Sequence, residues 1–312
     1  MTTLRLGTRG SPLARVQAAA VQEALVRSHP GLRIETVFIA TRGDKIQDVP
    51  LAKIGGKGLF LKEIEEALLR REIDFAVHSL KDVPAELPAG LSLVAHPARE
   101  DPSDAVVGRT APTIAALPVG ARVGTSSLRR SVQLRALRPD LEIVPLRGNV
   151  GTRIEKLDRG DLDAVVLAAA GLRRLGLFSR ATEVVAVDRM LPAVGQGILA
   201  IEARVDDAQT AAIVRTLHDR EAGLAAMAER AFLARVGGSC QTPIGCHARR
   251  GDGGWCVDAF VASLDASRFV RGRRSLVESA GEADLASAGL SLADELLDAG
   301  ARAILEEIAA GS

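Results

Sequence analysis

Aromatic residues are scarce in this chain of 312 residues, which has no tyrosine, one tryptophan and seven phenylalanines. Proteins that hold single-stranded nucleic acid need aromatic side chains on which bases stack, so the composition disfavours that class. An excess of positive charge is also lacking, because 40 Lys and Arg residues face 39 Asp and Glu residues and the net charge is +1. General nucleic-acid binders normally carry a large basic excess, and we therefore predict no nucleic-acid partner.

Cysteine and long apolar stretches are equally sparse. Cys240, Cys246 and Cys256 are too few for a disulfide framework, and their spacing fits no zinc motif, so we predict no metal site. The apolar run at 164–172 is nine residues long, far short of the ~20 that cross a bilayer. The first ten residues contain no apolar segment typical of a signal peptide. We expect a reduced, cytoplasmic protein with no membrane partner.

The first two thirds of the chain alternate short apolar runs with amphipathic helices, a pattern typical of α/β folds with mostly parallel sheets. A helix is expected to begin at Ser11-Pro12, because serine caps helix N-termini and proline suits the first helical position. Other helices are predicted to begin near 60, 128 and 150. Strands are predicted at 5–7, 33–39, 73–79, 91–95, 122–123, 141–146 and 164–168.

After about residue 218 the pattern changes to that of a small α+β domain. We predict a helix at 221–236, strands at 244–249, 256–264 and 269–277, and one last helix at roughly 284–309. Charge is also unevenly distributed: 121–180 holds twelve basic and six acidic residues, whereas 218–312 holds ten basic and fourteen acidic residues. The neutral total therefore hides a basic zone in the middle of the chain. Proline-bearing stretches near 97–102 and 192 are candidate hinges.

Cationic residues follow five of the predicted strands, where open α/β sheets bind their ligands. The segment Gly124-Thr125-Ser126-Ser127 adds hydroxyl groups and the N-terminus of a helix, which attract an anion. We predict a small polyanionic ligand rich in carboxylates or phosphates. Any one of these arginines alone fits a solvated helix face better than a binding site, but their recurrence at successive strand ends favours a shared cleft. The residues are Arg9, Lys81, Arg129, Arg130, Arg147, Arg153, Arg173 and Arg174.

Three further features each have two interpretations. Asp82, beside Lys81, either stabilises a developing cation in the cleft or accepts turn N–H groups. The glycine-rich segment 55–58 is either a mobile lid that brings Lys53 and Lys57 to an anion or a plain linker, and it lacks the pattern of a nucleotide phosphate loop. Cys240 is either structural or a nucleophile whose pKa a cationic cleft lowers. His78 fits best as a hydrogen-bonded residue at a strand end.

Six segments, HSLKDVP, VGTSSLRR, LRGNVGTR, AAGLRRLGL, LPAVGQG and GGSCQTPIG, occur in this order along the chain. Through them the whole chain resembles the hydroxymethylbilane synthase family, also called porphobilinogen deaminase. The resemblance implies head-to-tail condensation of four porphobilinogen molecules with loss of ammonia. The growing chain is then attached to a dipyrromethane cofactor, itself linked through a thioether to the cysteine that matches Cys240. Hydrolysis finally frees linear hydroxymethylbilane.

The resemblance also assigns roles to individual residues. Asp82 matches the catalytic aspartate, which is expected to hold pyrrole N–H groups and to stabilise the cation formed when ammonia leaves. Cofactor-binding positions match Ser79, Lys81, Thr125, Ser126, Ser127, Arg129, Arg130, Arg147, Gly148 and Asn149. Substrate-binding positions match Arg9, Lys53, Lys57, Phe60, Arg153, Arg174 and Gln196.

The family fold implied here has two lobes like the halves of a periplasmic binding protein, joined by two crossings, and a third domain with the cofactor cysteine. The expected domains are 1–97 with 198–217, then 98–197, then 218–312, in a monomeric enzyme. The alternative is a non-catalytic solute-binding module of the same two-lobed architecture. It accounts for the arginines at the strand ends, but it has no need of Cys240, Asp82 or the third domain.

Overall fold

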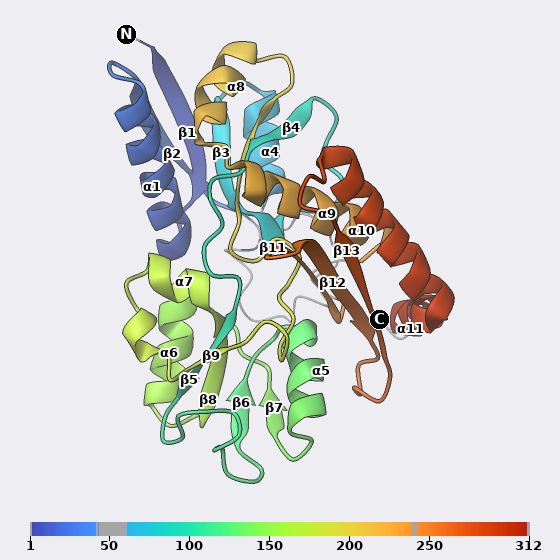
Figure 1. Cartoon of the computed structure of the whole chain (residues 1–312). Helices are drawn as coiled ribbons and strands as arrows, with labels where there is room; N and C mark the ends of the chain where they lie inside the picture. Colours follow the sequence, from blue (N-terminus) through green and yellow to red (C-terminus); the bar gives the residue numbers. More distant parts are fainter. Residues whose placement is uncertain (1, 42, 44–60, 239–241, 311–312) are drawn as a thin grey trace.

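The structure is a computed structural model that describes residues 2–41, 43, 61–238 and 242–310. Two α/β lobes lie one above the other, and a third, smaller domain packs at their side (Figure 1). Each lobe is built on a five-stranded sheet, and the third domain on a three-stranded sheet. No helix in the described part of the chain is long and apolar enough to span a membrane.

The first lobe joins strands from both ends of its sequence. It contains β1 (Thr3–Arg9), β2 (Arg33–Ile39), β3 (Phe75–Ser79), β4 (Leu91–Ala95) and β10 (Leu199–Arg204), in the order β2-β1-β3-β10-β4. β1 is parallel to β2 and β3, whereas β10 inserts antiparallel between β3 and β4. Helices α1 (Pro12–Ser28), α4 (Lys62–Leu69) and α8 (Ala208–Val214) pack on this sheet. Because β10 follows the second lobe in sequence, the chain passes between the lobes twice.

The second lobe repeats this arrangement. Its strands are β5 (Asp104–Gly108), β6 (Arg122–Gly124), β7 (Glu142–Val144), β8 (Ala164–Ala168) and β9 (Glu183–Val185), in the order β7-β6-β8-β5-β9. β5 runs antiparallel to its two neighbours, as β10 does in the first lobe. In both sheets one strand opposes the other four, which confirms the predicted mostly parallel α/β class. Helices α5 (Leu128–Leu137), α6 (Val150–Asp158) and α7 (Ala169–Arg174) begin just after strands β6, β7 and β8.

The third domain is the predicted α+β unit. Helix α9 (Arg220–Val236) precedes the antiparallel strands β11 (Ile244–Gly251), β12 (Gly254–Ala262) and β13 (Phe269–Leu276). Trp255, Val257 and Val261 of β12 pack in one core with α9 and with α10 (Glu282–Leu296). On the opposite face of the sheet, Phe260 contacts Val132 of α5 in the second lobe. The third domain is therefore packed against the lobes and does not extend away from them.

The prediction of one continuous helix over 284–309 is wrong. Helix α10 ends at Leu296, a wide turn follows at Leu297–Ala301, and α11 covers Arg302–Ala310. Gly300 has a φ of 110°, which side chains with a Cβ rarely adopt, so the backbone leaves the helical path there. The hydrophobic spacing continues through this break, and for that reason the sequence pattern alone does not reveal it.

Two segments join the lobes, residues 96–103 and 186–198, and we refer to them as the first and second crossing. The two crossings contact each other between the lobes: the Glu100 N–H of the first donates to the Gly197 carbonyl of the second at 3.2 Å. Gly197 has a φ of 90°, and a Cβ there would lie 2.2 Å from the Glu100 carbonyl oxygen. The close pairing of the crossings therefore depends on glycine at this position.

Candidate functional site

The predicted cationic side chains lie where strands of both lobes end, beside the crossings. Lys81 and Asp82 occupy a short 3-10 turn, Leu80–Asp82, directly after β3. In the second lobe, Thr125, Ser126 and Ser127 separate β6 from α5, and Arg147, Gly148 and Asn149 precede α6. Strand ends of two sheets thus supply one site, as the sequence predicts for an open α/β arrangement.

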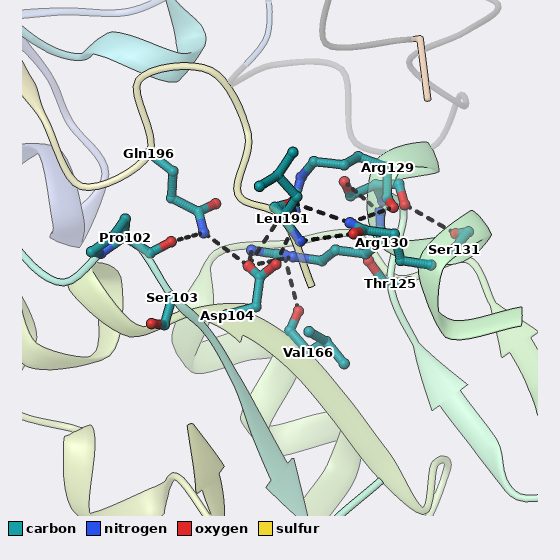
Figure 2. Close-up of polar contacts among 12 residues, drawn as sticks. Pro102, Ser103, Asp104, Thr125, Arg129, Arg130, Ser131, Val166, Leu191 and Gln196 are labelled. Atoms are coloured by element: carbon teal, nitrogen blue, oxygen red, sulfur yellow. Dashed lines mark hydrogen bonds and ion pairs between the residues drawn. The ribbon is translucent and has the colours of Figure 1, made fainter. Parts of the chain in front are cut away.

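Arg129 and Arg130 are buried and share one carboxylate, that of Asp104 at the start of β5 (Figure 2). Arg129 donates from Nη1 to Asp104 Oδ2 at 2.7 Å and from Nη2 to Oδ1 at 3.2 Å. Arg130 donates to Oδ1 from Nε at 2.9 Å and from Nη2 at 2.7 Å. Two guanidinium groups on one carboxylate leave the cluster with one net positive charge.

The second crossing is tied into this cluster (Figure 2). The Gln196 side chain donates from Nε2 to Asp104 Oδ1 at 3.0 Å and to the Pro102 carbonyl at 2.6 Å. Arg129 Nη1 also donates to the Leu191 carbonyl at 2.7 Å. Gln196, which the resemblance assigned to substrate binding, therefore joins both crossings to the arginine pair.

Charge on one lobe acts on titratable groups of the other. The pKa of Lys81 is lowered to about 8, chiefly by burial; Asp82 opposes this shift, and the charges of Arg130 and Arg129 contribute to it. Burial likewise lowers the pKa of Arg153 to about 10, helped by the charge of Arg130 and opposed by Asp82. Lys81 and Asp82 of the first lobe thus lie within electrostatic range of arginines of the second lobe. The proximity predicted from the strand ends is thus present for Lys81, Arg129, Arg130 and Arg153.

Burial alone raises the pKa of Asp104, yet Arg129 and Arg130 outweigh that effect and hold it far below its ordinary range. Asp104 therefore stays ionised, and mutual repulsion among the surrounding cations is relieved only in part. Sequence reasoning missed Asp104, because no local pattern connects the apolar run Asp104–Gly108 with the arginines. It also missed Gln17, whose buried amide donates to Ser79 Oγ at 3.0 Å.

The predicted hydroxyl and amide groups make local contacts in this structure. Ser126 Oγ donates to the Leu146 carbonyl and accepts from the Leu146 N–H, both at 2.9 Å. Ser127 caps α5 by accepting from the Arg130 N–H, and Asn149 caps α6 by accepting from the Thr152 N–H at 2.9 Å. Thr125 is buried and accepts from the Ser127 N–H at 3.2 Å. These contacts shape the loops, and a role toward ligand carboxylates stays a prediction.

The remaining predicted cations surround the same region. Arg9 lines a small pocket with Ser79, Asp82 and Gln17. Arg153 is partly buried and donates from Nε to the carbonyl of Gly148 at 2.8 Å. Arg174 Nη2 donates to the Gly197 carbonyl of the second crossing at 2.7 Å. Arg147 is partly buried at the start of its loop.

Four predicted site residues, Cys240, Lys53, Lys57 and Phe60, lie outside the described residues. Of the other two cysteines, Cys246 is fully buried in β11, and burial raises its pKa well above the ordinary value. Burial also raises the pKa of Cys256. Neither is an activated thiol. No group of three or more His, Cys, Asp or Glu residues suited to a metal ion occurs in the described part of the chain.

His78 forms the hydrogen bond expected of a structural strand-end histidine, because its Nε2 lies 3.0 Å from Glu202 Oε2. Both side chains are buried under the site on the side of α4. Glu65 of α4 belongs to the same acidic group, since burial and the charge of Glu202 raise its pKa to about 7. His78 lines the same small pocket as Arg9 and Asp82.

The site fits a ligand with several carboxylates. Arg129 Nε is buried and has no hydrogen-bond partner in the described structure, so one strong donor is left for an anion. Gln196 Oε1 is a buried acceptor that likewise has no hydrogen-bond partner in the described structure, so it is available to an N–H group of a ligand. Cations outnumber the two carboxylates of Asp82 and Asp104, and an anionic ligand would neutralise that excess. A pyrrole bearing acid side chains offers both complementary groups.

Comparisons with known proteins agree over nearly the whole chain. Residues 4–212 match the family model described as "Porphobilinogen deaminase, dipyromethane cofactor binding domain", and residues 223–298 match "Porphobilinogen deaminase, C-terminal domain". The porphobilinogen deaminase of Syntrophobacter fumaroxidans is 52% identical over 305 residues, which cover 98% of this chain and 97% of that relative. That of a Roseiflexus species is 52% identical over 303 residues, covering 97% of this chain and 98% of the relative. Among solved structures, the methionine-binding protein MetQ is similar with 15% identity and a TM-score of 0.46, over 69% of this chain and 89% of that protein.

Proposed function

The chain belongs to the porphobilinogen deaminase family, and from this premise we propose how its residues divide the work of the reaction. It is an enzyme that acts on porphobilinogen with a dipyrromethane cofactor. In our proposal it is a transferase that condenses four porphobilinogen molecules head to tail, releases ammonia at each addition and frees linear hydroxymethylbilane by hydrolysis. We further propose a monomer that works in the cytoplasm.

Cys240 is the proposed point of covalent attachment. The other two cysteines have raised pKa values, and Cys246 is sealed in a core, so neither is suited to form a thioether. When bound, the dipyrromethane supplies the pyrrole carbon to which the first substrate is joined. The residues of this chain that would hold its acid groups are Ser79, Lys81, Thr125, Ser126, Ser127, Arg129, Arg130, Arg147, Gly148 and Asn149.

Arginine suits this task because its planar guanidinium donates two parallel hydrogen bonds to a carboxylate. Asp104 fixes the planes of Arg129 and Arg130 beforehand, so the pair loses little rotamer freedom when a ligand binds. Arg9, Arg153, Arg174 and Gln196 would orient the incoming porphobilinogen. We propose that Lys53, Lys57 and Phe60, which precede α4 in the sequence, also bind the substrate.

Asp82 is the proposed catalytic residue. Its side chain is exposed and lines a small pocket with Arg9 and Ser79, and its charge acts on both Lys81 and Arg153. A carboxylate in this position accepts the pyrrole N–H and stabilises the positive charge that develops as ammonia leaves the substrate. Lys81 belongs to the first lobe and Arg153 to the second, so the charge of Asp82 acts on cations of both lobes. This electrostatic link between the lobes is the observation that carries the proposal.

We also propose the division of the chain into residues 1–97 with 198–217, then 98–197, then 218–312. It is supported by the position of β10 in the first sheet and by the separate antiparallel sheet of β11 to β13.

The ratio of ammonia to product tests this function. We expect purified protein incubated with porphobilinogen to release four ammonia molecules for each linear tetrapyrrole. A solute-binding module of the same architecture would instead bind porphobilinogen and release no ammonia, and that result would refute the proposal.

A further inference from the structure

Gln17 is a polar side chain on the buried face of α1, where the other buried residues are Ala18, Val21 and Leu25. Only 4% of its surface is exposed, so water contributes little to the hydrogen bonding of its amide. Burying an amide costs free energy unless the protein supplies its hydrogen bonds, whereas an apolar residue in this place would carry no such cost. Packing alone therefore does not explain a glutamine at this position of the helix.

The amide is bonded to Ser79 at the end of β3. Gln17 Nε2 donates to Ser79 Oγ at 3.0 Å, whereas Gln17 Oε1 lies 3.4 Å from the same oxygen. A hydroxyl normally donates to an oxygen over about 2.5–3.0 Å, so the contact in which Ser79 accepts is the stronger of the two. The Ser79 hydroxyl therefore keeps its own hydrogen for another acceptor, and its oxygen is held in place by a neighbouring helix.

Ser79 and Gln17 line one small pocket together with Arg9 and Asp82. Asp82 is the group proposed to accept the pyrrole N–H of the substrate, and Arg9 is proposed to orient that substrate. Ser79 is assigned above to acid groups of the cofactor, and this pocket places the same hydroxyl among the residues that bind porphobilinogen. A carboxylate that enters beside Arg9 would find the Ser79 O–H as a second, neutral donor.

We propose that Gln17 is a positioning residue for porphobilinogen, because it holds the Ser79 hydroxyl as a donor to a carboxylate of the incoming pyrrole. The inference rests on the proposed function, since it takes porphobilinogen as the ligand of this pocket. The effect of Gln17 passes through Ser79. Without the amide the hydroxyl turns freely, and binding weakens equally in the ground state and the transition state. A loss of that kind raises KM and leaves kcat unchanged.

A double-mutant cycle tests this coupling. Gln17→Met removes the amide and keeps a side chain of similar length. We expect KM for porphobilinogen to rise about 3–10-fold, the value of one neutral hydrogen bond, while kcat stays within about twofold of the wild type. In the Ser79→Ala background the same substitution should change KM by less than about twofold, because the group that Gln17 positions is absent. The intact mass of denatured Gln17→Met should still show the cofactor adduct.

Gln22→Met is the matched control on the same helix. Gln22 donates from Nε2 to the Ile34 carbonyl at 3.2 Å and accepts from Thr36 Oγ1 at 3.0 Å. It is not among the described residues that line the pocket. This variant also loses the hydrogen bonds of one glutamine amide of α1, and it should keep the wild-type KM.

Should Gln17→Met fail to fold, Gln17→Asn enters the same cycle, because it keeps a buried amide on a side chain that is one methylene shorter. A wild-type KM in the variant that folds, a lost adduct, or an equal rise in KM with and without the Ser79 hydroxyl would overturn the inference. Failure of the proposed function would look different, because the wild-type protein itself would then release no ammonia from porphobilinogen.

Discussion

Arg130 donates two hydrogen bonds to one oxygen of Asp104, from Nε at 2.9 Å and from Nη2 at 2.7 Å. The carboxylate is fully buried, and a second guanidinium shares it. This arrangement orders the cations of the second lobe and still leaves them in excess. In the proposed function an acid-rich oligomer would meet donors that are already oriented, which lowers the entropic cost of binding it.

Asp104→Asn should strongly destabilise the protein, because two buried guanidinium groups would lose the carboxylate that they share. Breaking a buried ion pair by removing one partner costs about 3–5 kcal/mol. Urea denaturation of the free protein measures the change. Asp158→Asn, which removes an exposed pair with Arg180, should cost less than about 1 kcal/mol. Equal effects from the two substitutions would show that Asp104 does not hold the arginine pair.

Asp82→Asn should retain the fold and lose most of the turnover. The side chain is exposed, so the free energy of unfolding is expected to change by less than about 0.5 kcal/mol. Removing one group that stabilises developing charge typically lowers kcat by about 10²–10³-fold. Glu86→Gln, at an exposed neighbouring position, is the control and should keep wild-type kcat. Near-normal turnover of Asp82→Asn would assign Asp82 to the turn alone.

Lys81 gives substrate binding a pH dependence. Burial lowers its pKa to about 8, so its positive charge is lost as the pH rises through that value. Lys81 is assigned to the acid groups of the cofactor, but loss of its charge makes the shared site less positive, so KM for the anionic porphobilinogen should rise above about pH 8. Arginine keeps its charge throughout this range, so Lys81→Arg should flatten the upper limb of the KM profile. Parallel profiles for the two proteins would show that another group causes the pH dependence.

Glu65 makes stability fall with increasing pH. Burial and the charge of Glu202 raise its pKa to about 7 in the folded state, against about 4.3 in an unfolded chain. Between these values the folded protein holds a proton that the unfolded chain has released, so the free energy of unfolding decreases as the pH rises from about 4.5 to 7. Glu65→Gln should remove this decrease and stabilise the protein at pH 8 by about 1–3 kcal/mol. Glu66→Gln, at a half-exposed neighbour, should keep the wild-type slope, and the same slope in Glu65→Gln would refute the assignment.

The sequence was most informative at the strand ends. Lys81 and the Arg129–Arg130 pair follow apolar runs whose periodicity predicts strands. Because ligands of open α/β sheets bind at the carboxyl ends of the strands, these cations could be assigned to a binding site. The same logic could not find Asp104, because β5 is a short apolar run with no period that distinguishes strand from helix. Nor could it place β10, whose partners β3 and β4 precede it by more than a hundred residues. Pairing at such sequence separation is decided by tertiary packing.

Local sequence patterns also do not predict the contacts that the two crossings make. Glu229 resembles any glutamate on an amphipathic helix until β11 and both crossings fold around it. Similarly, Gln196 lies in a motif that indicates a bend, but its bond to Asp104 depends on two chain segments meeting. The roles of Cys240, Lys53, Lys57 and Phe60 stay predictions, drawn from motif resemblance.

The mass of the denatured protein tests the central claim most directly, namely that a thioether at Cys240 holds the growing product within the arginine-lined site. Wild-type protein should be heavier than its sequence by two pyrrole units bearing their acid side chains. Cys256→Ser should keep this adduct, and Cys240→Ser should lose it together with turnover. Active wild-type protein with the bare sequence mass, or an adduct that persists in Cys240→Ser, would contradict the claim.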